Sequence, residues 1–127
     1  MSRSSAISAR LEEVFGPGGQ LARSIHDYRM RPGQAQMAAE VASAIRDNAV
    51  LVCEAGTGTG KTFAYLVPAL LCGGKVIIST GTKTLQDQLY HRDLPTVRDA
   101  LKVPLATALL KGRNNYVCHY YLERNLS

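Results

Sequence analysis

Eight residues near the middle of the chain, AGTGTGKT at positions 55–62, have the composition and spacing of a loop that binds phosphate groups. Glycines at alternate positions let backbone N–H groups approach an anion closely, because no Cβ atom stands in the way. Lys61 and Thr62 open a predicted helix, whose N-terminus adds a partial positive charge. The pattern predicts that the backbone from Thr57 to Thr62 cradles phosphates, that Lys61 reaches the β- and γ-oxygens, and that the Thr62 hydroxyl binds Mg²⁺.

This loop supplies the predicted catalytic groups, Lys61 and Thr62, and most of a nucleotide site. The nucleotide-binding residues predicted within it are Gly56, Thr57, Gly58, Thr59, Gly60, Lys61 and Thr62. The loop departs from G-x-x-x-x-G-K-[ST] at Ala55, so a small residue must suffice there. A glycine-rich turn with a solvated lysine is the simpler alternative. We favour the nucleotide site because strand, loop, Lys-Thr pair and helix are predicted in the required order.

Three short apolar runs predict strands around this loop: Ala49–Cys53, Lys75–Thr80 and Ala106–Leu110. A helix is predicted before the first run, and helices are predicted between the runs, with a break at Leu94-Pro95. The resulting order, β-α-β-α-β after a first helix, predicts an α/β fold with a doubly wound parallel sheet and flanking helices. Such sheets bind ligands at the carboxyl ends of their strands.

Gln34 begins the helix that precedes the first of these runs, three residues after Arg31. Its amide has both donors and an acceptor, and could hydrogen-bond to the edge of an adenine base. Taken locally, Gln34 could equally be a helix cap. Its position relative to the phosphate loop favours recognition of the base.

A second polar turn, Ser79-Thr80-Gly81-Thr82-Lys83-Thr84, follows the run that begins at Lys75. Thr82 or Thr84 could cap the helix that follows. Hydroxyl groups, a glycine and Lys83 together suit contacts with a phosphodiester backbone. A polar strand-to-helix turn is the alternative, and the neighbouring nucleotide site favours nucleic acid.

The composition is that of one globular domain: 127 residues, 46% apolar and 20% charged, with a net charge of +5. Residues 75–127 hold eight Lys and Arg against four Asp and Glu, a balance of +4 that suits a polyanionic partner or an ordinary solvated surface. No apolar run is long enough to cross a membrane. The N-terminus lacks the apolar centre of a secretory signal, so a cytoplasmic protein is predicted.

The three cysteines have no spacing that predicts a disulfide or a zinc site. Cys53 and Cys72 are most simply small core residues, because both lie in apolar segments. Cys118 lies in KGRNNYVCHYY, where basic residues alternate with tyrosines. That pattern suits either a single-strand binder or the packing face of a terminal helix.

One group that ATP hydrolysis needs has no candidate in the sequence. A second carboxylate should end a further buried strand, where it holds Mg²⁺ and positions water. The only apolar run that ends in an acidic residue leads into the phosphate loop itself, at Glu54. We therefore expect an N-terminal fragment that binds nucleotide but does not turn it over.

Four segments together, YRMRPGQAQM, LVCEAGTGTGKTFAYLVPALL, VIISTGTKTLQDQLY and LLKGRNNYVC, resemble the opening of the DinG/YoaA group of bacterial iron-sulfur helicases. This group is related to the XPD-type helicases of superfamily 2. The resemblance extends from about Gly19 to the C-terminus. It implies a P-loop NTPase (RecA-like) fold, of which this chain would hold an incomplete first motor domain.

The resemblance also implies roles for particular residues. Gln34 with Arg31 is similar to the adenine-recognising Q motif, and Gly58, Gly60, Lys61 and Thr62 are similar to motif I. Residues similar to motif Ia, which contacts DNA, are Ser79, Thr80, Gly81, Thr82, Lys83 and Gln86. Cys118 would be the first of four ligands of a [4Fe-4S] cluster, with the other three outside this chain.

The implied domains are a helical lead-in (1–33), the first part of an ATP-binding domain (34–110) and the start of a cluster domain (111–127). The implied activity is ATP-dependent 5′ to 3′ movement on single-stranded or forked DNA during repair, in a bacterial, nucleoid-associated protein. Two alternatives remain on the residues alone: a P-loop kinase of a small molecule, and a non-catalytic nucleotide- or DNA-binding module. The kinase would explain the loop but not Gln34 or the turn after Lys75.

Overall fold

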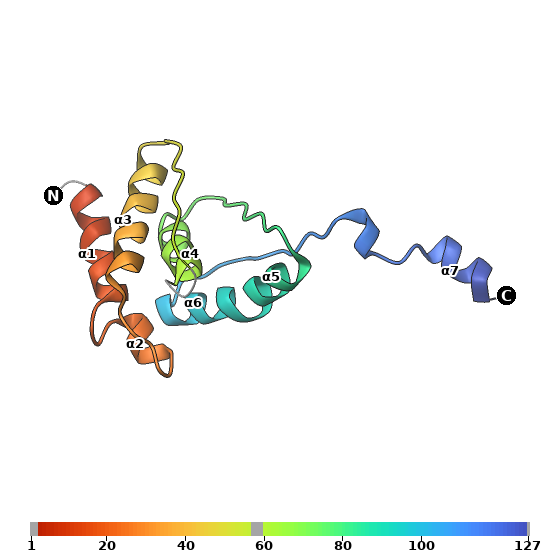
Figure 1. Cartoon of the computed structure of the whole chain (residues 1–127), viewed down its shortest axis with the longest axis horizontal. Helices are drawn as coiled ribbons and strands as arrows, with labels where there is room; N and C mark the ends of the chain where they lie inside the picture. The colour runs from red at the N-terminus through yellow and green to blue at the C-terminus, as the bar shows by residue number, and fades with distance from the viewer. Residues whose placement is uncertain (1–2, 57–59, 127) are drawn as a thin grey trace.

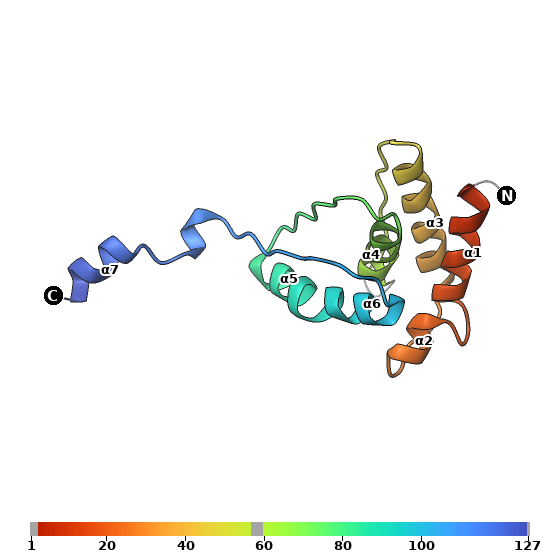
Figure 2. The same ribbon diagram turned by 180° about the vertical axis from the view of Figure 1, so that it is seen from behind.

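The computed structural model describes residues 3–56 and 60–126, and every regular element in this part of the chain is helical. The elements, in order, are α1 (Arg3–Phe15), α2 (Gln20–Ser24), α3 (Pro32–Arg46), α4 (Lys61–Leu71), α5 (Lys83–Gln88), the π-helical turn η1 (Leu89–Asp93), α6 (Leu94–Leu101), the 3₁₀ turn η2 (Arg113–Asn115) and α7 (His119–Leu126). Figure 1 shows a helical body from which the C-terminal residues project, and Figure 2 shows the same arrangement from behind.

The core lies between the helices of this body. α3 packs along α4, α1 packs against α3 and α4, and α2 packs against α6. The fully buried side chains with the largest volumes are Phe15, Leu21, Leu66, Val14, Val67, Val97 and Pro68. The helices of the N-terminal lead-in, α1 and α2, thus contribute to the same core as α4 and α6.

Helix α4 is the central element, and it begins at Lys61 as the loop pattern predicts. Gly60 precedes it with φ of +75°, a conformation that glycine adopts at little cost. Five of the eleven residues of α4 are buried, so the helix is held by packing on several sides: Ala64, Leu66, Val67, Pro68 and Leu70. The packing of these residues therefore fixes the position of the first turn of α4 relative to the other helices.

The predicted break at Leu94-Pro95 is wrong, because the chain stays helical from Lys83 to Leu101. In an ordinary α-helix the ring of Pro95 would clash with a carbonyl group of the preceding turn, and its missing N–H would leave a bond unmade. Here the preceding turn is π-helical, with the N–H of Leu94 bonded to the carbonyl of Leu89. This wider turn allows Pro95 to lie in the first turn of α6.

The predicted α/β fold with a parallel sheet is contradicted by this structure. Ala49–Cys53, Lys75–Thr80 and Ala106–Leu110 are not strands, and the described residues contain no sheet. They are connecting segments, visible in Figure 1 between α3 and α4, between α4 and α5, and after α6. Their apolar side chains do not form the core: Val50 and Val52 are each 94% exposed and Ile77 is 97% exposed.

The physical reason for this error is that an extended segment becomes a strand only when it pairs with a neighbouring strand. Apolar and β-branched residues disfavour helix and favour extended backbone, but hydrogen bonds to a neighbouring strand are what make a sheet. In this structure the helices bury one another, and the side chains of the apolar runs are mostly exposed, although Ile78 is partly buried against the core. Cys53 and Cys72 are consequently both exposed, so their prediction as core residues is also wrong.

Within the described part of the chain, no helix combines the length and the apolar character that crossing a membrane requires.

A matched pair of substitutions tests the division between helical core and exposed segments. We expect Leu66→Ala to lower the free energy of unfolding by about 2–5 kcal/mol, because it leaves a cavity between packed helices. Ile77→Ala removes an aliphatic side chain of the same size from a segment outside the core, and should change the free energy by less than about 0.5 kcal/mol. Urea unfolding followed by circular dichroism measures both, and similar losses in the two variants would contradict this arrangement.

Candidate functional site

Gln34 is the most buried polar residue of the candidate nucleotide site. It lies in the first turn of α3, and its side chain is almost fully enclosed, with the residue 4% exposed. Its Nε2 donates a hydrogen bond of 3.1 Å to the carbonyl oxygen of Gly60, at the beginning of α4. The structure therefore brings together two predicted site residues that are 26 positions apart. A role for Gln34 as a helix cap is not observed, because α3 has no side-chain cap.

Tyr28 holds the other end of the same amide. Its hydroxyl lies 3.2 Å from Gln34 Oε1 and 3.2 Å from the carbonyl oxygen of Phe15, at the end of α1. Burial raises the pKa of Tyr28, while the charge of Arg31 opposes this, so the hydroxyl keeps its proton at neutral pH and can donate it. Tyr28 was not among the residues predicted from the sequence, although the motif YRMRPGQ contains it.

Gly60 has a second reason to be glycine besides its backbone angle. A Cβ atom on this residue would collide with the side-chain amide of Gln34. Any other residue would therefore push Gln34 out of its place, and the contact between α3 and the end of the phosphate loop would be lost. The glycine that precedes Lys61 is thus explained by a tertiary contact as well as by its backbone angle.

A cavity of about 170 Å³ opens beside this group of residues. Its walls come from the segment between α2 and α3, from the first turn of α3 and from the beginning of α4. The lining residues are Ile25, Asp27, Tyr28, Arg29, Arg31, Gln34, Gly60 and Phe63. Arg31 and Gln34, which the sequence predicts as one unit, share this cavity with Gly60. Ile25 and Phe63 were not predicted, since nothing in the local pattern separates them from core residues.

The predicted phosphate-binding residues that the structure describes lie around the start of α4. Lys61 is exposed at the first position of the helix, and Thr62 follows it, partly buried. Thr62 takes part in a hydrogen bond with Tyr65, whose pKa is raised chiefly by burial and lowered in part by that bond. Gly56 is exposed on the other side of the loop. The predicted residues Thr57, Gly58 and Thr59 lie outside the described residues.

The predicted DNA-binding residues form a turn at the start of α5 and do not line the cavity. Thr82 caps α5, because its Oγ1 accepts a 3.2 Å hydrogen bond from the N–H of Leu85. Thr80 Oγ1 donates to the carbonyl of Thr82 at 3.4 Å. Ser79, Gly81 and Lys83 are exposed, whereas Gln86 is partly buried and donates to the carbonyl oxygen of Leu110 at 3.0 Å.

The C-terminal residues do not form a packing face in the described structure. Tyr116, Tyr120 and Tyr121 are each more than half exposed, and α7 has no buried residue. Cys118 is exposed just before α7. The described residues contain no group of three or more His, Cys, Asp or Glu that could hold a metal ion. They do not, by themselves, provide the four converging thiolates of an iron-sulfur cluster.

Comparison with known proteins places these residues in a family. The profile of the DEAD/DEAH box helicase family matches residues 31–115, which is more than half of the chain. The chain is 60% identical over 114 residues to ATP-dependent DNA helicase YoaA of Escherichia coli (strain K12), an alignment that covers 90% of this chain and 18% of that protein. The YoaA helicase of Haemophilus influenzae is 53% identical over 115 residues, covering 91% of this chain and 18% of that protein.

More distant relatives belong to the DinG group. ATP-dependent helicase DinG of Mycobacterium tuberculosis (strain H37Rv) is 52% identical over 96 residues, covering 69% of this chain and 14% of that protein. No solved structure gives a significant match. The chain thus spans less than a fifth of the length of each of these relatives.

The resemblance to the DinG/YoaA group is thereby confirmed, and the kinase alternative loses its support. The matched region includes Arg31 and Gln34, the whole phosphate loop and the turn that begins α5. On this similarity the chain belongs to the DEAD/DEAH box helicase family.

Proposed function

We propose that this chain is the ATP-binding N-terminal segment of a DNA helicase that moves 5′ to 3′ on single-stranded or forked DNA in DNA repair. The observation that carries the proposal is the contact of the buried Gln34 amide with Gly60, beside a cavity at the start of the phosphate-loop helix. The names of the relatives, ATP-dependent DNA helicases, support ATP-dependent action on DNA. In this proposal residues 1–33 are the lead-in, 34–110 the first part of the ATP-binding domain and 111–127 the start of a cluster domain.

The cavity would take the adenine base. A primary amide has two N–H donors and an oxygen with two lone pairs, so the bonds to Gly60 and Tyr28 leave Gln34 with capacity for a base edge. Adenine offers both a donor and an acceptor on such an edge. Arg31 lines the same cavity, where its planar guanidinium could stack on the base.

The phosphates would lie at the N-terminus of α4. Gly56 and the loop residues Thr57, Gly58 and Thr59 would supply backbone N–H groups, and Gly60 would supply the turn into the helix. The exposed Lys61 ammonium would stabilise charge on the transferring phosphoryl group. Thr62 offers one hydroxyl oxygen, and this fits Mg²⁺, which usually takes few protein ligands besides phosphate oxygens and water.

DNA would contact the turn at the start of α5. Ser79, Gly81 and Lys83 are exposed there and carry a hydroxyl, a bare backbone and a cation, the groups that bind a phosphodiester. Thr80 and Thr82 hold the turn in shape, and Gln86 follows one turn later on the same helix. The surplus of basic residues after position 75 supports an anionic partner.

The first test concerns Lys61. In a protein that spans the full length of the relatives, we expect Lys61→Ala to lower ATPase and unwinding together by about two to three orders of magnitude, through loss of charge stabilisation. Lys75→Ala, an exposed lysine outside the site, is the matched control and should leave both rates near the parent value. In the 127-residue chain alone we expect ATP binding without turnover. Turnover that Lys61→Ala removes would show that the chain is catalytically complete.

The second test separates base recognition from phosphate binding. Gln34→Ala should reduce the preference for ATP over GTP, measured as the ratio of kcat/KM values, by roughly fivefold or more, because a bidentate amide contact is worth about 1–3 kcal/mol of discrimination. Gln36→Ala makes the same change on an exposed position of α3 and should leave the ratio unaltered. An unchanged ratio in the Gln34 variant would refute the base-reading role.

The third test concerns Cys118, which we propose as one ligand of a [4Fe-4S] cluster whose other three thiolates come from outside these 127 residues. In the full-length protein, Cys118→Ser should remove the visible iron-sulfur absorbance, whereas Cys72→Ser should retain it. The isolated 127-residue chain should contain no iron by metal analysis. Stoichiometric iron in that chain, or a full spectrum in Cys118→Ser, would show that the assignment is wrong.

A further inference from the structure

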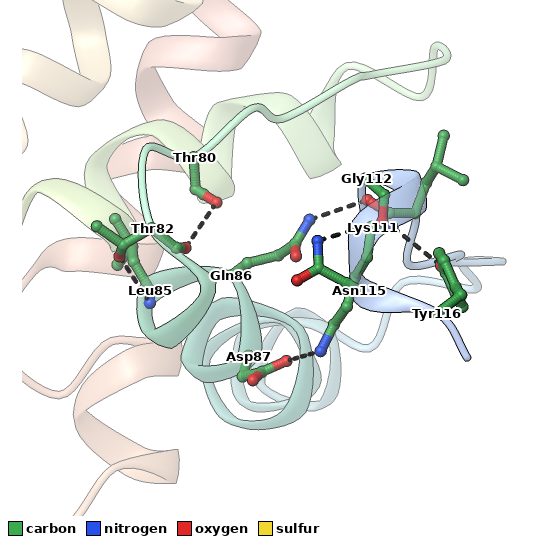
Figure 3. A network of polar contacts seen from close by, with 10 residues as sticks. Thr80, Thr82, Leu85, Gln86, Asp87, Lys111, Gly112, Asn115 and Tyr116 are labelled. Atoms are coloured by element: carbon green, nitrogen blue, oxygen red, sulfur yellow. Dashed lines mark hydrogen bonds and ion pairs between the residues drawn. The ribbon is translucent and has the colours of Figure 1, made fainter. Parts of the chain in front are cut away.

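Two neighbouring residues of α5 reach across to the segment that follows Leu110. Gln86 Nε2 donates to the carbonyl oxygen of Leu110 at 3.0 Å, and Asp87 Oδ1 lies 2.9 Å from Lys111 Nζ. Figure 3 shows the two side chains pointing from α5 toward the segment that carries Lys111. Consecutive residues of α5 thus contact consecutive residues that lie 24 positions later in the chain. Two such contacts fix the direction of the later segment as well as its distance from α5.

The same segment is folded on itself immediately after this attachment. The backbone N–H of Lys111 donates to the Tyr116 hydroxyl at 3.0 Å, and the η2 turn is closed by the bond from Asn115 N–H to the Gly112 carbonyl at 2.9 Å. Asn115 Nδ2 also donates to the Gly112 carbonyl at 3.2 Å. Residues 111–116 therefore form a small hydrogen-bonded loop that α5 holds at its first residue.

Beyond this loop, residues 117–126 are all exposed. α7 has no buried residue, and Figure 1 shows it well separated from the helical body. The hydrogen bond from Lys111 lowers the pKa of Asp87, so the carboxylate stays charged at neutral pH. The attachment is thus polar and charged, with Lys111 27% and Asp87 46% exposed in their side chains.

We propose that Gln86 and Asp87 form a latch that sets the direction in which residues 111–126 leave the helical body. In this role Gln86 and Asp87 are positioning residues for the C-terminal segment. The inference goes beyond the proposed function and stands on the contacts alone. The latch has two consequences for that function: it sets the place of Cys118, two residues after Tyr116, and it engages the side chain of Gln86, which the proposed function also places near DNA.

The latch can be tested by amide hydrogen exchange on the 127-residue chain, with residues 111–116 compared with α4. We expect Asp87→Asn and Lys111→Met each to speed exchange in residues 111–116 by about two- to fivefold, the range for a partly exposed ion pair. Exchange in α4 should stay unchanged. Asp99→Asn is the matched control, because it removes the carboxylate of another exposed ion pair, with Arg98 on α6.

Three further variants distinguish a latch from general loosening. Gln86→Ala should also speed exchange in residues 111–116, and combining it with Asp87→Asn should speed it further. The exchanged pair Asp87→Lys with Lys111→Asp should restore slow exchange. Raising the salt concentration to about 1 M, where the Debye length is about 3 Å, should speed exchange in the parent and leave Asp87→Asn unaffected.

Unchanged exchange in residues 111–116 of Asp87→Asn and Gln86→Ala would overturn the proposal. Equal acceleration in α4 and in residues 111–116 would overturn it too, because the two residues would then support the whole fold. These measurements use neither nucleotide nor DNA, so their outcome is independent of the tests of the proposed function.

Discussion

The hydrogen bond between Gln34 and Gly60 is the contact on which the candidate nucleotide site depends. It joins the first turn of α3 to the residue from which α4 begins, and the side chain that forms it is buried. A buried amide is tolerated only when its polar groups are paired, so Gln34 requires the partners that Gly60 and Tyr28 provide. Tyr28 extends this linkage to the end of α1 through the Phe15 carbonyl. Gln34 and Tyr28 together thus connect α1, α3 and α4.

The groups proposed to do chemistry stand outside the apolar core and are carried by its helices. Lys61 is exposed at the first position of α4, and Lys83 is exposed at the first position of α5. The body of α4 is anchored by buried residues such as Leu66, whereas α5 has no buried residue and continues directly into η1, where Leu89 is buried. This division lets polar and charged groups remain hydrated while packing fixes where they are.

The buried core and the polar attachment of the C-terminal residues lie in different parts of the chain. The helical body contains the core, whereas residues 111–126 bury no side chain and are attached through Gln86 and Asp87. Polar attachments of this kind are weaker than packed cores and are sensitive to salt. The described C-terminal residues are therefore attached to the helical body through a hydrogen bond and an ion pair, whereas the candidate nucleotide site lies beside packed helices and a buried hydrogen bond.

The sequence by itself determined the features that depend on neighbouring residues: the start of α4 at Lys61, a threonine cap on α5 and the family, since turn chemistry, capping and motif spacing are local. The structure then showed that Thr82, and not Thr84, is that cap. It also pointed to Gln34, but not to Tyr28 as its partner. Only the tertiary structure decided that the apolar runs, including Val50 and Ile77, lie outside the core, because a strand and an unpaired extended segment share one pattern. Pairing and burial are contacts between distant residues, so they arise only when the whole chain packs.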